Sequence, residues 1–173
     1  EEVLAAIEAA GLTPANHNGK GQVVAAGTVE QLEAFAAKPP SRTRLFPLSV
    51  AGAFHTVHME PAVDHLREVA AAMPTTTPSV ALLSNLDGNV VTDGREFANR
   101  LVNQVAHPVR WDLCMDTMVE RSVTGLLELA PAGTLTGIAK RNLKGVELFN
   151  LNTPDQIPAA REFVAAHSSK ENA

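Results

Sequence analysis

Short apolar runs alternate with helix-forming segments along the second half of the chain, and this alternation constrains the fold more than any other feature. The apolar runs 125–129 and 146–151 are followed by segments with helical spacing, 135–143 and 155–166. An uninterrupted apolar strand is typically buried on both faces, and strands that alternate with helices usually pair in parallel. The sequence therefore predicts an α/β fold with helices on both faces of a sheet.

The middle of the chain continues this pattern. Helices are predicted over 59–73, where Pro61 fits the first turn and Pro74 ends the helix, and over 95–105 and 111–121. The run 80–84 is predicted as a further buried strand, followed by a turn at Asp87-Gly88-Asn89.

The first fifty residues have a different order: helix 3–10, strand 12–16, strand 22–26, helix 28–38 and strand 43–50. Thr28 and Gln31 have the spacing of a capping box, which favours a helix start there. One preceding strand would complete the β-α-β-β-α-β unit of a ferredoxin-like module. We therefore expect a ferredoxin-like small subdomain over 1–52 that lacks its first strand, and part of an α/β core over 53–173.

Composition excludes several classes of partner. With 14 Lys and Arg against 19 Asp and Glu, the net charge is −5, which gives no basic surface for nucleic acid. No stretch approaches the roughly 18 apolar residues of a membrane span, and the acidic start, Glu1-Glu2-Val3, is unlike a secretory signal. The single cysteine, Cys114, suits a reducing compartment. We expect a cytoplasmic protein.

Two histidines stand out among the six. His55 and His58 follow the strand predicted over 43–50, at the point where the chain enters a helix. Ligands of open α/β folds bind beyond the carboxyl ends of strands, so this is a candidate site. The remaining histidines outside this region are expected to be solvated or structural, namely His17, His107 and His167.

Metal binding and nucleotide binding are both disfavoured. His55, His58 and His65 do not combine with a further ligand in a zinc spacing, because His55 is expected to precede the helix that carries the other two. The glycine-rich turn at 18–21 lacks the spacing of a phosphate-binding loop and precedes a strand.

The chain contains a plausible base without a plausible nucleophile. No serine has the Gly-x-Ser-x-Gly context of a nucleophile elbow. Cys114 lies in a predicted helix, where a cysteine is most often a small buried hydrophobe.

Five landmarks occur in order over nearly the whole chain. They are Asn16-His17-Asn18 with Gly21-Gln22-Val23-Val24 and Gly27, Gly52-Ala53-Phe54-His55-Thr56-Val57-His58-Met59, Gln104 with Pro108-Val109-Arg110-Trp111, Glu128-Leu129-Ala130-Pro131, and Leu135-Thr136-Gly137. This series resembles the malonyl-CoA:acyl carrier protein transacylases. The resemblance implies an α/β-hydrolase-like acyltransferase core with an inserted ferredoxin-like subdomain.

The resemblance also implies a chemistry: ping-pong transfer of a malonyl group from malonyl-CoA to the phosphopantetheine thiol of acyl carrier protein, in fatty acid synthesis and without a metal or redox cofactor. His55 matches the histidine that takes the proton of a serine nucleophile. Gln104 matches the position whose backbone carbonyl orients that histidine. Asn16 and Asn18 match a loop near the coenzyme A entrance.

Parts of the family pattern have no match in this chain. These are the serine elbow, the oxyanion-hole glutamine and the arginine that pairs with the malonyl carboxylate. We therefore expect residues 1–173 to be the carboxy-terminal portion of such an enzyme and to be inactive alone. Two alternatives remain: an acyltransferase domain of a polyketide system, and a non-catalytic module that binds carrier protein.

Overall fold

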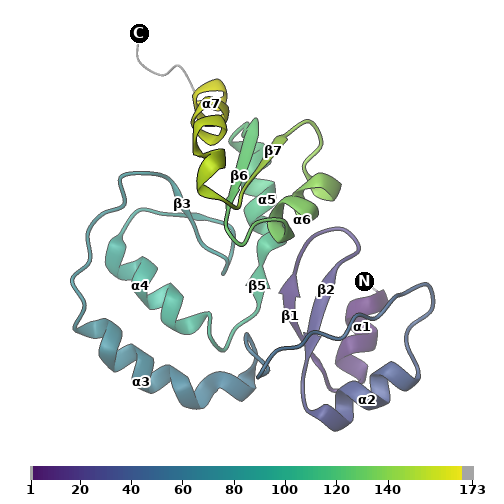
Figure 1. The fold of residues 1–173 in the computed structure, drawn as a ribbon. Helices are drawn as coiled ribbons and strands as arrows, with labels where there is room; N and C mark the ends of the chain where they lie inside the picture. Colours follow the sequence, from purple (N-terminus) through teal and green to yellow (C-terminus); the bar gives the residue numbers. More distant parts are fainter. Residues whose placement is uncertain (1, 169–173) are drawn as a thin grey trace. The chain divides into compact units, whose positions relative to one another are not determined.

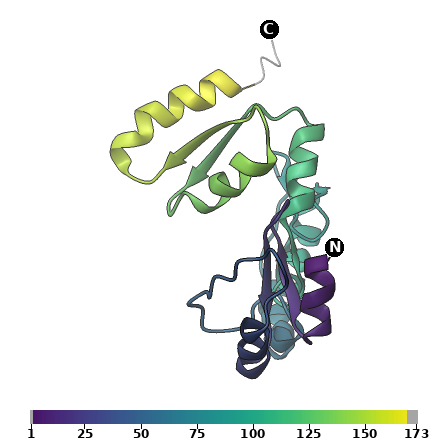
Figure 2. The ribbon, with the colours of Figure 1, turned by 90° about the vertical axis from the view of Figure 1, so that its right-hand side faces the viewer.

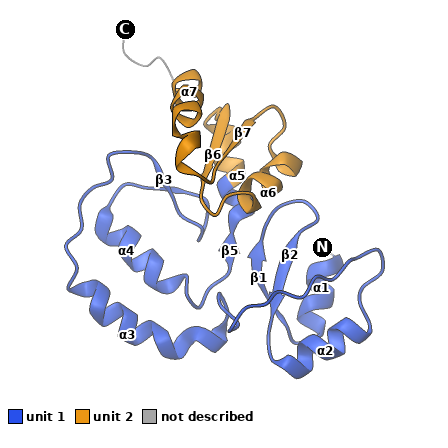
Figure 3. Cartoon of the chain, in the orientation of Figure 1, with its two compact units in different colours: residues 1–114 blue, residues 115–173 orange. Residues whose placement is uncertain are grey.

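The computed structural model describes residues 2–168, and the chain forms two compact units (Figure 3). Unit 1 comprises residues 1–114 and unit 2 comprises residues 115–173. The subdomain boundary predicted at 52/53 falls inside unit 1 and stays a prediction. The polar composition of 168–173 predicts a loose tail, and all of it after Ser168 lies outside the described part of the chain.

Unit 1 begins with the predicted helix, strand, strand, helix series. The elements are α1 (Glu2–Ala9), β1 (Thr13–His17), β2 (Val23–Ala26) and α2 (Val29–Ala37). Gly11 has φ +72°, which allows the chain to turn out of α1. The capping box at α2 is confirmed, because the Thr28 hydroxyl accepts from the Gln31 backbone N–H and the Gln31 side chain accepts from the Thr28 N–H.

The strand predicted over 43–50 is wrong for the described structure, in which this segment has no regular secondary structure. Figure 2 shows it as part of a loop that projects from unit 1. Its apolar side chains lie in solvent, with Phe46 76% and Val50 68% exposed. A strand needs a neighbour to accept its backbone hydrogen bonds, and no described strand pairs with this segment: the sheet that includes β1 contains only β2, β1 and β5 (Val109–Arg110), in that order.

The rest of unit 1 contains a helix pair and a small hairpin (Figure 1). After the 3-10 turn η1 (Val57–Met59), α3 (Glu60–Ala71) and α4 (Gly94–Asn103) lie side by side, with β3 (Leu82–Leu83) and β4 (Val90–Val91) between them in sequence. The buried strand predicted over 80–84 is wrong in extent and environment. Only two residues pair, antiparallel to β4, and Val80 is 73% exposed.

Unit 2 follows the predicted pattern closely. After α5 (Trp111–Glu120), which begins in unit 1, come β6 (Gly125–Leu129), α6 (Thr134–Asn142), β7 (Glu147–Leu151), the 3-10 turn η2 (Pro154–Gln156) and α7 (Ile157–His167). Strands β6 and β7 pair in parallel over five residues. Figures 1 and 2 show α6 and α7 on opposite faces of this strand pair, as predicted for an α/β fold.

The single parallel sheet suggested by the alternation is replaced by three small sheets in residues 2–168. Parallel pairing is limited to β6 with β7 and β1 with β5. None of the helices in the same described range is both long and apolar enough to span a membrane.

Candidate functional site

His55 lies in the turn that leads into η1, and its backbone is held in an unusual conformation. Its φ is +64°, in the left-handed region that few residues other than glycine adopt. The His55 backbone N–H donates to the Val105 carbonyl oxygen at 3.0 Å. Such backbone strain is found most often at functional sites, where the surrounding structure holds the residue in place.

The imidazole of His55 is oriented by a second carbonyl from the same segment. Nδ1 lies 2.7 Å from the Gln104 carbonyl oxygen, a contact between residues 49 positions apart. A carbonyl oxygen can only accept, so Nδ1 carries the proton and the lone pair of the neutral ring is on Nε2. Nε2 reaches solvent and has no hydrogen-bond partner among residues 2–168. The ring is therefore arranged as a base that can take a proton at Nε2.

These two carbonyls are available because a helix ends there. Gln104 is the C-cap of α4, and carbonyls at a helix C-terminus lack intrahelical partners. The Gln104 carbonyl also accepts the His107 N–H at 3.3 Å, so its acceptor capacity is shared within one turn. The Gln104 side chain has no part in this contact with His55.

Thr56 fixes the turn from the other side of His55, and sequence reasoning missed it. Its side chain is 1% exposed, donates to the Ala53 carbonyl at 2.6 Å and accepts the His58 N–H at 3.3 Å. Thr56 is the N-cap of η1. The signal available in the sequence was a threonine directly before a helix start, which is a common capping position.

Asn16 and Asn18 lie at the end of β1 and in the turn that follows it. Asn16 pairs with Val109 of β5, and the Asn18 backbone N–H donates to the Gln22 carbonyl at 3.0 Å. Asn18 is buried. Among the described residues no hydrogen bond joins either asparagine to His55 or Gln104, so the structure brings together one predicted pair, His55 with Gln104.

The other chemically interesting side chains have local roles. His107 Nδ1 lies 2.8 Å from the Asn103 carbonyl, and His167 Nδ1 lies 2.9 Å from the Thr124 hydroxyl. Cys114 is buried as predicted, and burial raises the pKa of its thiol to about 11. The cysteine is therefore protonated near neutral pH and cannot act as a ready nucleophile.

Unit 2 contains a buried carboxylate at the start of α6. Glu128 is 8% exposed, and it accepts the backbone N–H groups of Gly133, Leu135 and Thr136 at 2.8 to 2.9 Å, as well as the Thr136 hydroxyl at 3.0 Å. Burial acts to raise the pKa of Glu128, but these hydrogen bonds outweigh it and lower the pKa to about 2. Both carboxylate oxygens accept hydrogen bonds from the start of α6, so we assign Glu128 a structural role.

Known proteins resemble this chain over most of its length. It is 48% identical over 153 residues to the malonyl CoA-acyl carrier protein transacylase of Mycobacterium tuberculosis, a match that covers 88% of this chain and 51% of the relative. The transacylase of Escherichia coli is 34% identical over 154 residues, covering 88% and 50%. No family model matches the chain.

Solved structures give the same result. The crystal structure of MCAT from Mycobacterium tuberculosis superposes with a TM-score of 0.88 at 47% identity, covering 91% of this chain and 52% of that one. A type II PKS acyl-carrier protein in complex with its malonyl-transacylase gives 0.84 at 29% identity, covering 94% and 55%. Fold and sequence thus relate the chain to α/β acyltransferases.

Within that class, its relatives are the malonyl CoA-acyl carrier protein transacylases. The chain spans about half the length of the curated relatives it matches. It is homologous to the part of a transacylase that these alignments cover.

Proposed function

We propose that this chain provides the proton-transfer part of an enzyme that moves a malonyl group from malonyl-CoA to the phosphopantetheine thiol of acyl carrier protein. The observation that carries this proposal is the 2.7 Å contact from His55 Nδ1 to the Gln104 carbonyl, in a chain homologous to transacylases of that name. Fatty acid synthesis in the cytoplasm is the setting we infer for it.

The proposed mechanism has two half-reactions that use the same ring nitrogen. His55 Nε2 takes the proton of a serine hydroxyl supplied by polypeptide outside residues 1–173, while the serine oxygen attacks the malonyl thioester. The protonated ring then gives that proton to the departing coenzyme A thiolate. In the second half-reaction the carrier thiol is deprotonated at Nε2, attacks the malonyl ester, and the serine regains a proton.

A neutral orienting group suits this substrate. The Gln104 carbonyl fixes the ring tautomer without placing a full negative charge beside a malonyl carboxylate. Proton transfer of this kind contributes about 10²- to 10⁴-fold to rate. Asn16 and Asn18 are proposed to contact the coenzyme A part of the donor; Asn16 pairs with Val109, five residues after Gln104.

Residues 1–52 are proposed to form a small ferredoxin-like subdomain that receives a strand from outside this chain. In the split β-α-β order, the first strand lies between the third and fourth strands. Here the corresponding strands are β2, which is at the end of its sheet, and the unpaired segment 43–50. The exposed Leu48 and Val50 side chains of that segment support this arrangement.

Acyl carrier protein is proposed as the acceptor partner. A structural relative of this chain is a malonyl-transacylase in complex with a type II PKS acyl-carrier protein. That relative also keeps a polyketide pathway as an alternative setting for the same transfer.

Three measurements test how the proposed functions are divided between residues 1–173 and the polypeptide outside them. Residues 1–173 incubated with malonyl-CoA should show no malonyl adduct by intact mass, and a serine-linked adduct would contradict the need for an outside hydroxyl. Co-expression with the unmatched half of the Mycobacterium tuberculosis relative should restore transfer to acyl carrier protein.

Hydrogen exchange in the same complex should slow within 43–50 if a strand pairs there, and unchanged exchange would contradict the subdomain proposal.

A further inference from the structure

We propose that Arg95 and Arg100 are positioning residues for His55, acting through the placement of α4. This inference rests on the proposed role of His55. The carbonyls of Gln104 and Val105 hold the ring and backbone of His55, and both lie at the end of α4. Any movement of α4 along its axis would therefore change the contact that sets the His55 tautomer.

Arg95 joins the start of α4 to the end of α3. Its Nη1 donates to the Ala70 carbonyl at 2.8 Å and its Nη2 donates to the Met73 carbonyl at 2.6 Å. Carbonyls at a helix C-terminus carry partial negative charge, so a guanidinium there makes charge-assisted hydrogen bonds. Two donors on one planar group fix distance and direction together.

The chain path makes this contact relevant to His55. Helix α3 begins five residues after His55 and leads away from it, whereas α4 leads back to Gln104. Hydrogen bonds thus join the chain at both ends of the helix pair, from His55 to Gln104 at one end and from Arg95 to Ala70 at the other. With both ends bonded, the axial register of α4 against α3 is set.

Close backbone packing at the start of α4 also fixes the position of α4 relative to the end of α3. A Cβ atom built on Gly94 would clash with the Thr76 carbonyl oxygen. The segment after α3 therefore passes directly over the first residue of α4, next to Arg95. A side chain at position 94 would push the two backbones apart.

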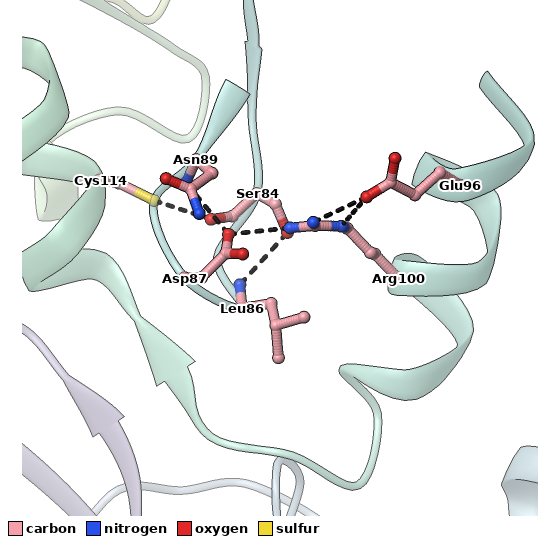
Figure 4. Close-up of polar contacts among 7 residues, drawn as sticks. All are labelled: Ser84, Leu86, Asp87, Asn89, Glu96, Arg100 and Cys114. Carbon is pink, nitrogen blue, oxygen red and sulfur yellow. Dashed lines mark hydrogen bonds and ion pairs between the residues drawn. The ribbon is translucent and has the colours of Figure 1, made fainter. Parts of the chain in front are cut away.

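Arg100 ties the middle of α4 to the turn between β3 and β4 (Figure 4). Its Nη1 donates to Asp87 Oδ1 at 2.8 Å, while Nε and Nη2 donate to Glu96 at 2.9 and 2.7 Å. The Arg100 side chain is largely buried. The Asp87 carboxylate also accepts the Asn89 N–H at 3.0 Å, so the oxygen that Arg100 contacts is bonded within the turn as well. This tether opposes rotation of α4.

The test reads the His55 ring directly by nitrogen-15 NMR of residues 1–173. Arg95→Gln and Arg100→Gln are compared with Arg67→Gln, whose arginine pairs with Asp64 on the exposed face of α3 and joins no second element. A His55→Gln spectrum assigns the signal. We expect solvent exchange of the His55 Nδ1 proton to accelerate about tenfold in Arg95→Gln, less in Arg100→Gln, and not in Arg67→Gln. Arg95→Lys should restore part of the protection.

An unchanged Nδ1 proton in Arg95→Gln, with the amide spectrum intact, would overturn the proposal. Equal acceleration in Arg67→Gln would do the same, because it would indicate general loosening. If Arg95→Gln does not fold, Arg95→Lys and Arg100→Gln decide by the same measurement. In the co-expressed transferase the variants should lower kcat and leave KM unchanged. The tautomer readout does not depend on activity, so it separates this inference from the proposed function.

Discussion

The C-terminus of α4 and the N-terminus of α6 each hold a titratable side chain, and they do so in opposite ways. The C-terminus of α4 offers carbonyl acceptors, and one of them binds the Nδ1 proton of His55. The N-terminus of α6 offers N–H donors, and three of them bind the Glu128 carboxylate. Each arrangement satisfies backbone groups that the helix itself leaves unpaired.

The difference lies in what remains free. Both oxygens of Glu128 are occupied, and Thr136 Oγ1, which donates to Glu128, also lies 2.7 Å from Asn150 Oδ1, so the cluster is closed. His55 uses one nitrogen for orientation and leaves Nε2 accessible. A buried carboxylate whose two oxygens both accept from a helix start is structural, whereas an oriented ring with one accessible nitrogen can exchange protons with a substrate.

The largest expected effect comes from removing the accessible Nε2 of His55. In the co-expressed transferase, His55→Ala should lower kcat by about 10²-fold or more, because proton transfer from the serine and carrier thiol loses its base. Transfer to acyl carrier protein is measured by the rate of malonyl-carrier formation. The control is His65→Ala, whose imidazole is exposed on α3. Near-normal transfer by His55→Ala would remove the distinction between the two helix ends.

Glu128→Gln should have the next largest effect, on stability. The amide NH2 would face the backbone N–H groups of Gly133 and Thr136, which now donate to the carboxylate, so one part-buried and one buried donor lose their acceptor. We expect the free energy of unfolding of residues 1–173 to fall by about 2–3 kcal/mol in urea. Glu162→Gln on the exposed side of α7 is the matched control. Equal stability of the two variants would contradict a structural role for Glu128.

The pH dependence of stability should follow the same residue. Because folding lowers the pKa of Glu128 from 4.5 to about 2, its contribution is fully present above pH 4.5 and is lost as pH falls towards 2. The stability difference between the wild-type chain and Glu128→Gln should therefore shrink from pH 6 to pH 2.5. Urea unfolding at a series of pH values measures it. A constant difference would mean that ionisation of Glu128 is not what stabilises α6.

Local sequence signals predicted unit 2 and the cap of α2 well. Thr28 with Gln31 marked the start of α2, and the apolar run 125–129 became β6 with unchanged bounds. These features depend on interactions within a few residues, which a single sequence contains. The role of Glu128 was missed, although a glutamate at the end of a buried strand, shortly before a Gly-Thr helix start, was a usable signal.

Features that depend on distant partners were harder to predict. The segment 43–50 has strand-forming residues, but without a paired strand it has no regular secondary structure and is mostly exposed. The contact of His55 with the Gln104 carbonyl joins residues 49 positions apart, and no local pattern indicates it; the family resemblance did. Arg95 donates to the backbone carbonyls of Ala70 and Met73 at the end of α3. Any residue type has such a carbonyl, so the sequence does not indicate this contact.

The smallest expected effect separates the side-chain and backbone parts of the Glu128 cluster. Thr136→Val keeps the backbone N–H at 2.8 Å from Glu128 but removes the hydroxyl that donates to the carboxylate and lies beside Asn150. We expect a loss of about 1 kcal/mol in the free energy of unfolding. Thr134→Val, an exposed neighbour on the same helix, is the control for the change of side chain. If Thr136→Val cost as much as Glu128→Gln, the hydroxyl rather than the helix N-terminus would hold the carboxylate, and the contrast with α4 would no longer apply.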